Sequence, residues 1–258
     1  MTNSTIPASR FFDIFDGLII DVGDPNCVFG RRDAVLKKLI WMSMLDTLSA
    51  VAFSGEKSVR KRFTRFVSTY CAWGDCERVS LPHLLVVLEA NPSPNFDKLL
   101  SEVRSRLGKW LPSGGALDLD ADPLCSELAP LWPISCSGFQ ETVNRRTLDD
   151  MRHVSLLYEL RCNLVHELRS RGPEFQGVDW KDDSPAYWYL RSDGPWELSY
   201  PELFVQGLCR SGLANLKAYF DRTEHSTLTN FALGPFFIPE FNELWQTQLQ
   251  AKQTQSSP

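Results

Sequence analysis

The sequence predicts a mainly α-helical fold, and three observations support this prediction. Apolar residues recur at spacings of three and four along most of the chain, which is the pattern of amphipathic helices. Glycine and proline separate these stretches from one another. The 258 residues are 43% hydrophobic and 23% charged, so the chain can bury a full core and is neither disordered nor collagen-like. We expect a single domain over residues 1–258.

The amino-terminal half is predicted to hold four helices after an irregular start. Gly17, Gly23, Pro25 and Gly30 lie in that start, before the first clear helical pattern. The first two helices are separated by a Ser-Gly pair, and the other two begin near prolines, which suit the first turn of a helix. The predicted helices span residues 33–53, 56–70, 82–89 and 94–110.

A loop and the longest predicted helix follow. Residues 113–146 are rich in proline and glycine, so we expect a loop or insertion over the core. Thr147 and Asp150 form a near-capping box, which predicts the start of a helix over residues 147–171. This helix ends before a Gly-Pro pair.

The remaining elements are a hairpin and a last helix. The aromatic-rich segments 186–190 and 196–200 flank an Asp-Gly-Pro turn and predict a β-hairpin. A helix follows over residues 201–220, where Gly207 and Gly212 predict close approach to another helix.

Charge and cysteine content limit the class of protein. The chain has 27 Lys and Arg against 32 Asp and Glu, a net charge of -5, so it is not a strongly basic nucleic-acid coat, although a local basic face is compatible with this total. It lacks the roughly 18–20 unbroken apolar residues of a membrane span and the apolar stretch of a secretory signal. The seven scattered cysteines do not form a disulfide framework. We therefore expect a cytoplasmic protein with reduced thiols and no membrane partner.

The segment Arg161-Cys-Asn-Leu-Val-His166 lies in the middle of the longest predicted helix. Arg161 falls within the apolar stripe of that helix, where its charge needs an anionic or carbonyl partner. His166 lies roughly 140° around the helix from Arg161, and Asn163 lies about 60° from His166. One helix alone therefore makes a poor Arg/His site, but two copies across a dimer axis can bring both residue types into one cleft. The alternative is that Arg161 pairs with a buried carboxylate such as Asp46 and that His166 is an ordinary exposed histidine.

This segment resembles the Arg-x(4–6)-His motif of the HEPN superfamily, the higher eukaryote and prokaryote nucleotide-binding domains. The Asn after the Arg and the apolar residues before the His are frequent in that motif. Members are all-α bundles with the motif in a late helix, and the similarity of pattern covers residues 33–171, which we interpret as a HEPN-like helical core. The chain departs from the minimal bundle in its insertion at 113–146, its hairpin-and-helix extension at 172–241 and its tail at 242–258.

The resemblance implies a metal-independent endoribonuclease that works as a homodimer, of the kind found in toxin–antitoxin and phage-defence systems. Attack by the ribose 2′-hydroxyl would leave a cyclic phosphate. In this scheme His166 exchanges protons with the reacting oxygens, Arg161 binds the scissile phosphate, and Asn163 holds the imidazole or a phosphate oxygen. No metal or cofactor is required, and an antitoxin or other regulatory protein is a possible partner.

Basic residues outside the motif are candidates for contact with the RNA backbone. Arg60, Lys61 and Arg65 belong to a helix with five positive charges between residues 57 and 65, and Arg169 follows the motif by one turn. The alternative is a solvated charged face.

Metal-site patterns fail in this sequence. Asp118, Asp120 and Asp122 have the spacing of a calcium loop, but Pro123 stands where the loop needs glycine. Cysteine and histidine spacings do not provide four zinc ligands.

Three functional hypotheses remain. The first is the ribonuclease dimer. The second is a non-catalytic HEPN module that binds a nucleotide, RNA or a protein partner. The third is a helical interaction protein without a nucleic-acid role, for which Arg161 would be bonded to an internal carboxylate.

Overall fold

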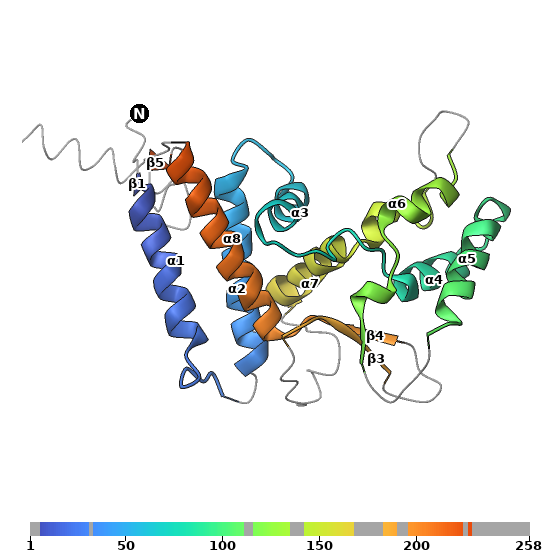
Figure 1. The fold of residues 1–258 in the computed structure, drawn as a ribbon, viewed down its shortest axis with the longest axis horizontal. Helices are drawn as coiled ribbons and strands as arrows, with labels where there is room; N and C mark the ends of the chain where they lie inside the picture. The colour runs from blue at the N-terminus through green and yellow to red at the C-terminus, as the bar shows by residue number, and fades with distance from the viewer. Residues whose placement is uncertain are drawn as a thin grey trace, which may run out of the picture.

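The computed structural model describes residues 6–30, 33–110, 116–134, 142–167, 183–189, 196–223 and 227–228. These residues form a mainly helical protein, as predicted, with two small sheets (Figure 1). The α-helices are α1 (Ala8–Gly23), α2 (Asp33–Ala52), α3 (Val59–Tyr70), α4 (Leu81–Ala90), α5 (Asp97–Leu107), α6 (Cys125–Leu128), α7 (His153–Glu167) and α8 (Glu202–Arg222). The strands are β1 (Ile6–Pro7), β2 (Ala116–Asp118), β3 (Ala186–Tyr189), β4 (Trp196–Ser199) and β5 (Thr227–Leu228), and short 3-10 segments are η1 (Pro94–Phe96), η2 (Leu119–Ala121), η3 (Ala129–Leu131) and η4 (Leu148–Met151).

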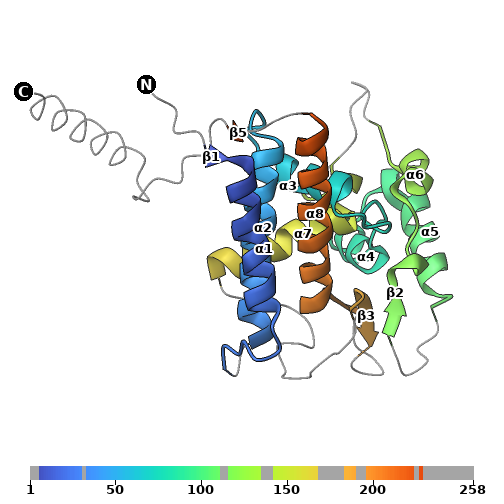
Figure 2. The same ribbon diagram turned by 60° about the vertical axis from the view of Figure 1, so that its left-hand side comes forward.

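The helices form two groups with separate hydrophobic clusters. Helices α1, α2 and α8 run side by side, and α3 and α7 pack against them (Figures 1 and 2). Helices α4, α5 and α6 lie at the other end of the molecule and enclose a second, smaller cluster. Helix α7 contacts α2 and α3 through its apolar face, and its amino end leads back to η4 in the second group.

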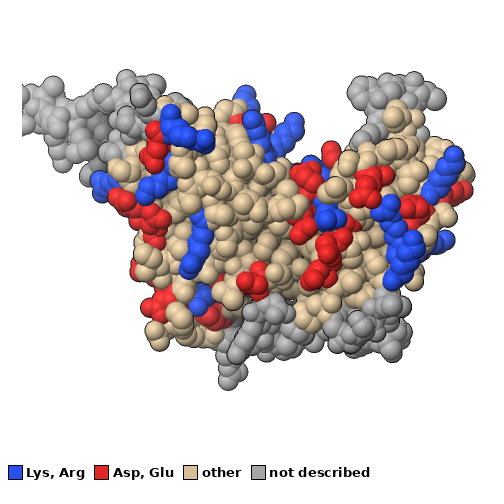
Figure 3. All heavy atoms as spheres, in the orientation of Figure 1, with Lys and Arg blue, Asp and Glu red and all other residues tan. Residues whose placement is uncertain are grey.

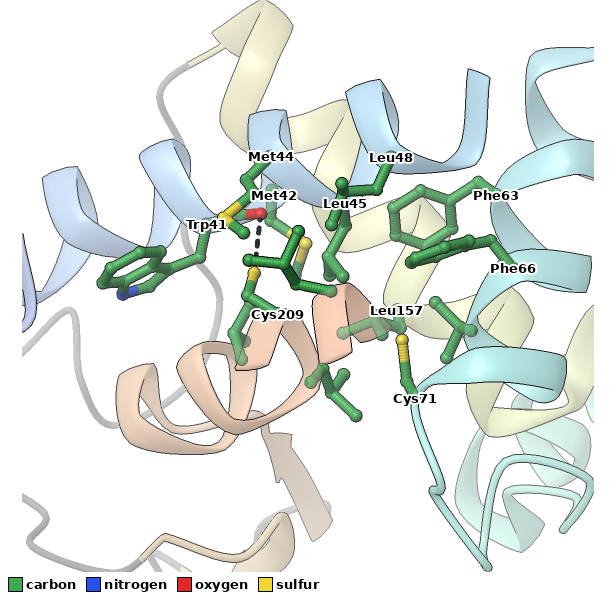
Figure 4. Close-up of a cluster of buried hydrophobic side chains, with 14 of the residues drawn as sticks. Trp41, Met42, Met44, Leu45, Leu48, Phe63, Phe66, Cys71, Leu157 and Cys209 are labelled. Atoms are coloured by element: carbon green, nitrogen blue, oxygen red, sulfur yellow. Dashed lines mark hydrogen bonds between the residues drawn. The ribbon is translucent and has the colours of Figure 1, made fainter. Parts of the chain in front are cut away.

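The larger cluster is built from helices that are distant in sequence (Figure 4). Leu45 of α2, Phe66 of α3 and Leu157 of α7 are all fully buried in it. The Cys209 thiol of α8 donates to the Trp41 carbonyl oxygen of α2 at 3.3 Å, which joins these two helices across the core.

One of the two glycines predicted to mark close helix approach does so. A Cβ at Gly212 would lie 3.0 Å from both Cys71 Sγ and the Phe66 ring, so only glycine lets α8 approach α3 at this point. A Cβ at Gly207 would meet nothing within 4 Å, and the prediction for that position is wrong.

The prediction of an irregular start is wrong, because residues 8–23 form helix α1. Phe11, Phe12 and Ile19 are buried, and the Phe12 ring contacts that of Phe220 on α8 at a centroid distance of 5.5 Å. These apolar residues recur at helical spacing. Gly17 lies inside this helix and does not end it.

The prediction that residues 113–146 form a loop is corrected by the structure. Within the described parts of this range, β2, η2, α6 and η3 form short elements. Strand β2 pairs antiparallel with β3, which itself pairs with β4 as the predicted hairpin. The resulting sheet order is β2-β3-β4, so the insertion completes the sheet.

The long helix starts later than the sequence predicts. Thr147 and Asp150 form the expected capping contacts, with the Thr147 N–H donating to Asp150 Oδ2 at 2.8 Å, but they open the 3-10 segment η4. Arg152 is extended, and α7 begins at His153 because the N–H groups of His153 and Val154 donate to the carbonyl oxygens of Arg78 and Cys76. These backbone bonds replace a side-chain cap.

The other helix predictions are close to the structure, with α2, α3, α4 and α8 found within three residues of the expected bounds. The predicted helix at 94–110 is η1 followed by α5. The predicted helix residues 168–171 and the tail at 242–258 lie outside the described residues. Among the helices that the structure describes, none is long and apolar enough to cross a bilayer.

Candidate functional site

Helix α7 presents different residues on its two sides. Val154, Leu157 and Leu164 are buried toward α2 and α3. Leu160 and Asn163 lie on a second stripe of the helix, and this stripe lines a cavity that is described below. Residues 161 and 163 are separated by roughly 200° around a helix, so the two sides of α7 face separate environments.

Arg161 is on the side facing α2, where Asp46 holds its guanidinium. The distance from Arg161 Nη2 to Asp46 Oδ2 is 2.6 Å, and the two side chains are 13% and 20% exposed. Burial lowers the pKa of Arg161, but the hydrogen bond and charge of Asp46 outweigh burial and raise that pKa overall. Asp46 Oδ1 and Arg161 Nε are also buried and have no hydrogen-bond partner in the described part of the chain. The internal ion pair anticipated by the alternative interpretation is therefore present.

The structure does not bring Arg161, Asn163 and His166 together within one chain. Asn163 is half-buried and lines the cavity on the other side of α7. His166 is exposed in the last turn of the helix, as the alternative interpretation also expected. A site that uses both Arg161 and His166 on one phosphate therefore needs a second chain or a bound ligand that spans them.

Of the predicted RNA-contacting residues, Arg60 is already engaged in the fold. Its guanidinium lies 2.7 Å from Asp150 Oδ1 and 3.2 Å from Glu159 Oε1, and Arg146 also binds Glu159 Oε1 at 3.2 Å. This cluster of four side chains, the Arg60–Glu159 cluster, links α3 and α7 with η4. It contains two positive and two negative charges, so Arg60 has no excess charge to offer.

Lys61 and Arg65 are exposed on α3, where a polyanion can reach them. The Arg65 guanidinium lies over the Phe53 ring, 4.3 Å from its centroid. On the face seen in Figure 3, acidic and basic side chains are interspersed instead of forming a patch of one sign. Arg169 lies outside the described residues.

Sequence reasoning missed a buried polar network at the amino end of α7. Asp122 Oδ2 accepts from the Tyr187 hydroxyl at 2.5 Å and lies 2.8 Å from His153 Nε2, while Asp122 Oδ1 accepts from the Leu81 N–H at 3.0 Å. Burial and then the Asp122 charge raise the pKa of Tyr187 far above its usual value, so it remains a hydroxyl donor. The aspartate that we rejected as a calcium ligand thus organises the junction of η2, α4, α7 and β3. No local sequence pattern indicates its burial.

This network extends to the cavity. Ser80 Oγ lies 2.7 Å from the Tyr187 hydroxyl oxygen and 2.7 Å from His83 Nδ1. The Tyr200 hydroxyl lies 3.1 Å from His153 Nδ1. His83 and Tyr200 both line the cavity, so a buried chain of hydrogen bonds orients two of its wall residues.

The cavity has a volume of about 530 Å³ and lies between α4, η4, α7 and β4. We call it the α4–α7 cavity. Its walls are mostly aliphatic, and its polar and aromatic residues come from all four elements or their ends. They include His83, Arg146, Asp150, Glu159, Asn163 and Trp196.

Comparison with protein-family models, curated proteins and solved structures gives no match.

Proposed function

We propose that this protein is a metal-independent endoribonuclease of the HEPN type, which acts as a homodimer through Arg161 and His166. Support comes from the arrangement at the carboxyl half of α7. Asp46 holds the Arg161 guanidinium in a fixed orientation, and the exposed His166 imidazole follows on the same helix. A held cation and an accessible imidazole are the two groups that cleavage by the 2′-hydroxyl needs.

The chemistry assigns one role to each group. His166 accepts the proton of the ribose 2′-hydroxyl or gives a proton to the leaving 5′-oxygen. A guanidinium has five N–H donors; Asp46 engages the Nη2 group and Nε is buried, so the remaining Nη donors of Arg161 are the ones that would bind a phosphate oxygen. Because the two residues diverge on one helix, the His166 of one chain acts with the Arg161 of the other.

The second candidate is a non-catalytic module that binds a nucleotide, RNA or a protein partner. The ion pair favours it, because the Asp46 carboxylate already neutralises the guanidinium that a phosphate would bind. This candidate predicts RNA binding without cleavage. It also predicts that Lys61→Glu and Arg65→Glu weaken RNA binding in low salt. Lys98→Glu makes an equal charge change at an exposed position of α5 and should weaken RNA binding less.

The first experiment measures cleavage of a panel of RNAs in EDTA. The wild type should produce ends with a cyclic phosphate, and His166→Ala should reduce the rate by about 100-fold or more. Lys98→Ala, also at an exposed helical position, should retain the wild-type rate. Full activity in His166→Ala, a requirement for a divalent metal, or the absence of cleavage by the wild type would refute the proposal.

Mixing two inactive variants tests whether the site is shared between chains. Arg161→Ala and His166→Ala are each expected to be inactive, but a mixed dimer of the two contains one complete site. After subunit exchange at equal concentrations, half of the dimers are mixed and each has one of two sites, so about one quarter of the wild-type activity should return. If activity does not return while mass spectrometry detects mixed dimers, the shared site is excluded.

A further inference from the structure

The α4–α7 cavity provides a second site that the ribonuclease proposal does not use. Its volume of about 530 Å³ is within the range of pockets that bind small molecules. It lies on the side of α7 opposite Arg161, and Asn163 is the residue that it shares with the ribonuclease scheme.

The charges around the cavity select a neutral ligand. Arg146, Asp150 and Glu159 line it, and all three belong to the Arg60–Glu159 cluster, in which positive and negative charges balance. A charged ligand would lose its hydration without gaining an unpaired counter-charge. A neutral molecule avoids this cost.

The Asn163 amide is a polar group of the wall with unused hydrogen-bonding capacity. It lines the cavity and makes no hydrogen bond to another residue in the described part of the chain. A side-chain amide presents an N–H donor beside a carbonyl acceptor. A ring that carries an adjacent N–H and C=O, as in a lactam, is complementary to both at once.

The remaining walls favour a flat, apolar ring. Trp196 from β4 contributes an indole, which Trp110 holds in an edge-on contact at a centroid distance of 5.5 Å. Leu156 and Leu160 of α7 face the same space. Aromatic and aliphatic surfaces of this kind bind a planar ring through burial and stacking.

We propose that the α4–α7 cavity binds a neutral, planar heteroaromatic molecule with an adjacent N–H and C=O, which pair with the Asn163 amide while the ring packs between Trp196 and the leucines of α7. His83, which lies 2.7 Å from Ser80 Oγ through Nδ1, also lines the wall.

A matched set of two-ring probes tests each part of this assignment by isothermal titration calorimetry on the full chain. Quinolin-2(1H)-one has the lactam pair and should bind with a dissociation constant on the order of 100 µM, as expected for a ligand of this size. Quinoline lacks the pair and should bind about tenfold more weakly. Quinoline-2-carboxylate has the same rings with a negative charge and should bind at least about tenfold more weakly than the lactam.

Two variants locate the site, and a third is the control. Asn163→Leu should weaken quinolin-2(1H)-one about tenfold while leaving quinoline within about twofold. Val86, 63% exposed on the cavity wall, can be changed to Trp without disturbing the core, and Val86→Trp should block the lactam. Ile134→Trp introduces the same ring at a residue that is 66% exposed and outside the cavity wall, so it should bind like the wild type.

Several results would overturn the assignment. They are absence of saturable binding of quinolin-2(1H)-one, equal binding by the carboxylate, unchanged lactam affinity in Asn163→Leu, and unchanged affinity in Val86→Trp. None of these measurements depends on RNA cleavage, so the ligand site and the ribonuclease proposal can fail separately.

Discussion

Helix α7 carries a histidine at each end, and the two have opposite environments. His153 is completely buried, with Nε2 2.8 Å from Asp122 Oδ2 and Nδ1 3.1 Å from the Tyr200 hydroxyl. His166 is exposed in the last turn. The difference separates two uses of one residue type on one helix. A change at the amino end acts on the stability of the fold, whereas a change at the carboxyl end tests function with the fold intact.

The largest expected effect is at the acceptor of the buried end. Asp122→Ala removes the partner of three buried donors, on Leu81, Tyr187 and His153. The Leu81 N–H and the His153 imidazole then lose their acceptor in the interior, while the Tyr187 hydroxyl keeps only Ser80 Oγ, so we expect a loss of about 4 kcal/mol in the free energy of unfolding. Urea denaturation followed by circular dichroism measures it.

An exposed aspartate two residues earlier provides the control. Asp120 is exposed, so Asp120→Ala should change the free energy of unfolding by less than about 0.5 kcal/mol. A loss below about 1 kcal/mol for Asp122→Ala would mean that the network does not organise the junction between the two groups of helices.

The two histidines themselves give the next comparison. His153→Ala creates a cavity, removes one of the three donors to Asp122 and removes the imidazole contact of the Tyr200 hydroxyl, so we expect a loss of about 3 kcal/mol in the free energy of unfolding. His166→Ala should change it by less than about 0.5 kcal/mol. Similar losses in thermal and urea unfolding for the two variants would contradict the contrast between the ends of α7.

The same contrast explains what the sequence could predict. Helical spacing predicted most helices, and the position of Arg161 in an apolar stripe predicted that it needs an anionic partner, with Asp46 among the candidates. The exposure of His166 was also an explicit alternative. These inferences depend on local periodicity and on the cost of burying a charge.

The features that the sequence could not predict depend on distant contacts. Asp122 is buried because residues from α4, α7 and β3 enclose it, and no neighbour in the sequence indicates this. Strand β2 forms because β3 offers an edge more than sixty residues later in the chain. The ion pairs of Arg60 with Asp150 and Glu159 likewise join separate elements, and they turned a predicted RNA contact into a structural one.

Arg161, which pairs with Asp46, lies between the two histidines on α7. The expected energy of this pair is also between the effects of His153→Ala and His166→Ala on the free energy of unfolding. A double-mutant cycle with Arg161→Ala and Asp46→Ala should give a coupling energy of about 2 kcal/mol, because the pair is mostly buried. The exposed Arg104–Glu89 pair, whose side chains are 58% and 45% exposed, should give less than about 0.5 kcal/mol in the same assay.

The coupling energy also bears on function, since an arginine strongly bound to Asp46 has less to gain from a phosphate. If Asp46→Asn strengthens RNA binding while His166→Ala does not, the carboxylate competes with RNA for the guanidinium. A coupling energy near zero would instead show that Asp46 holds Arg161 only weakly. The fixed orientation of the Arg161 guanidinium, on which its proposed catalytic role depends, would then be lost. Helix α7 would keep the buried network around His153 at its amino end but would have no preorganised catalytic site in its carboxyl half.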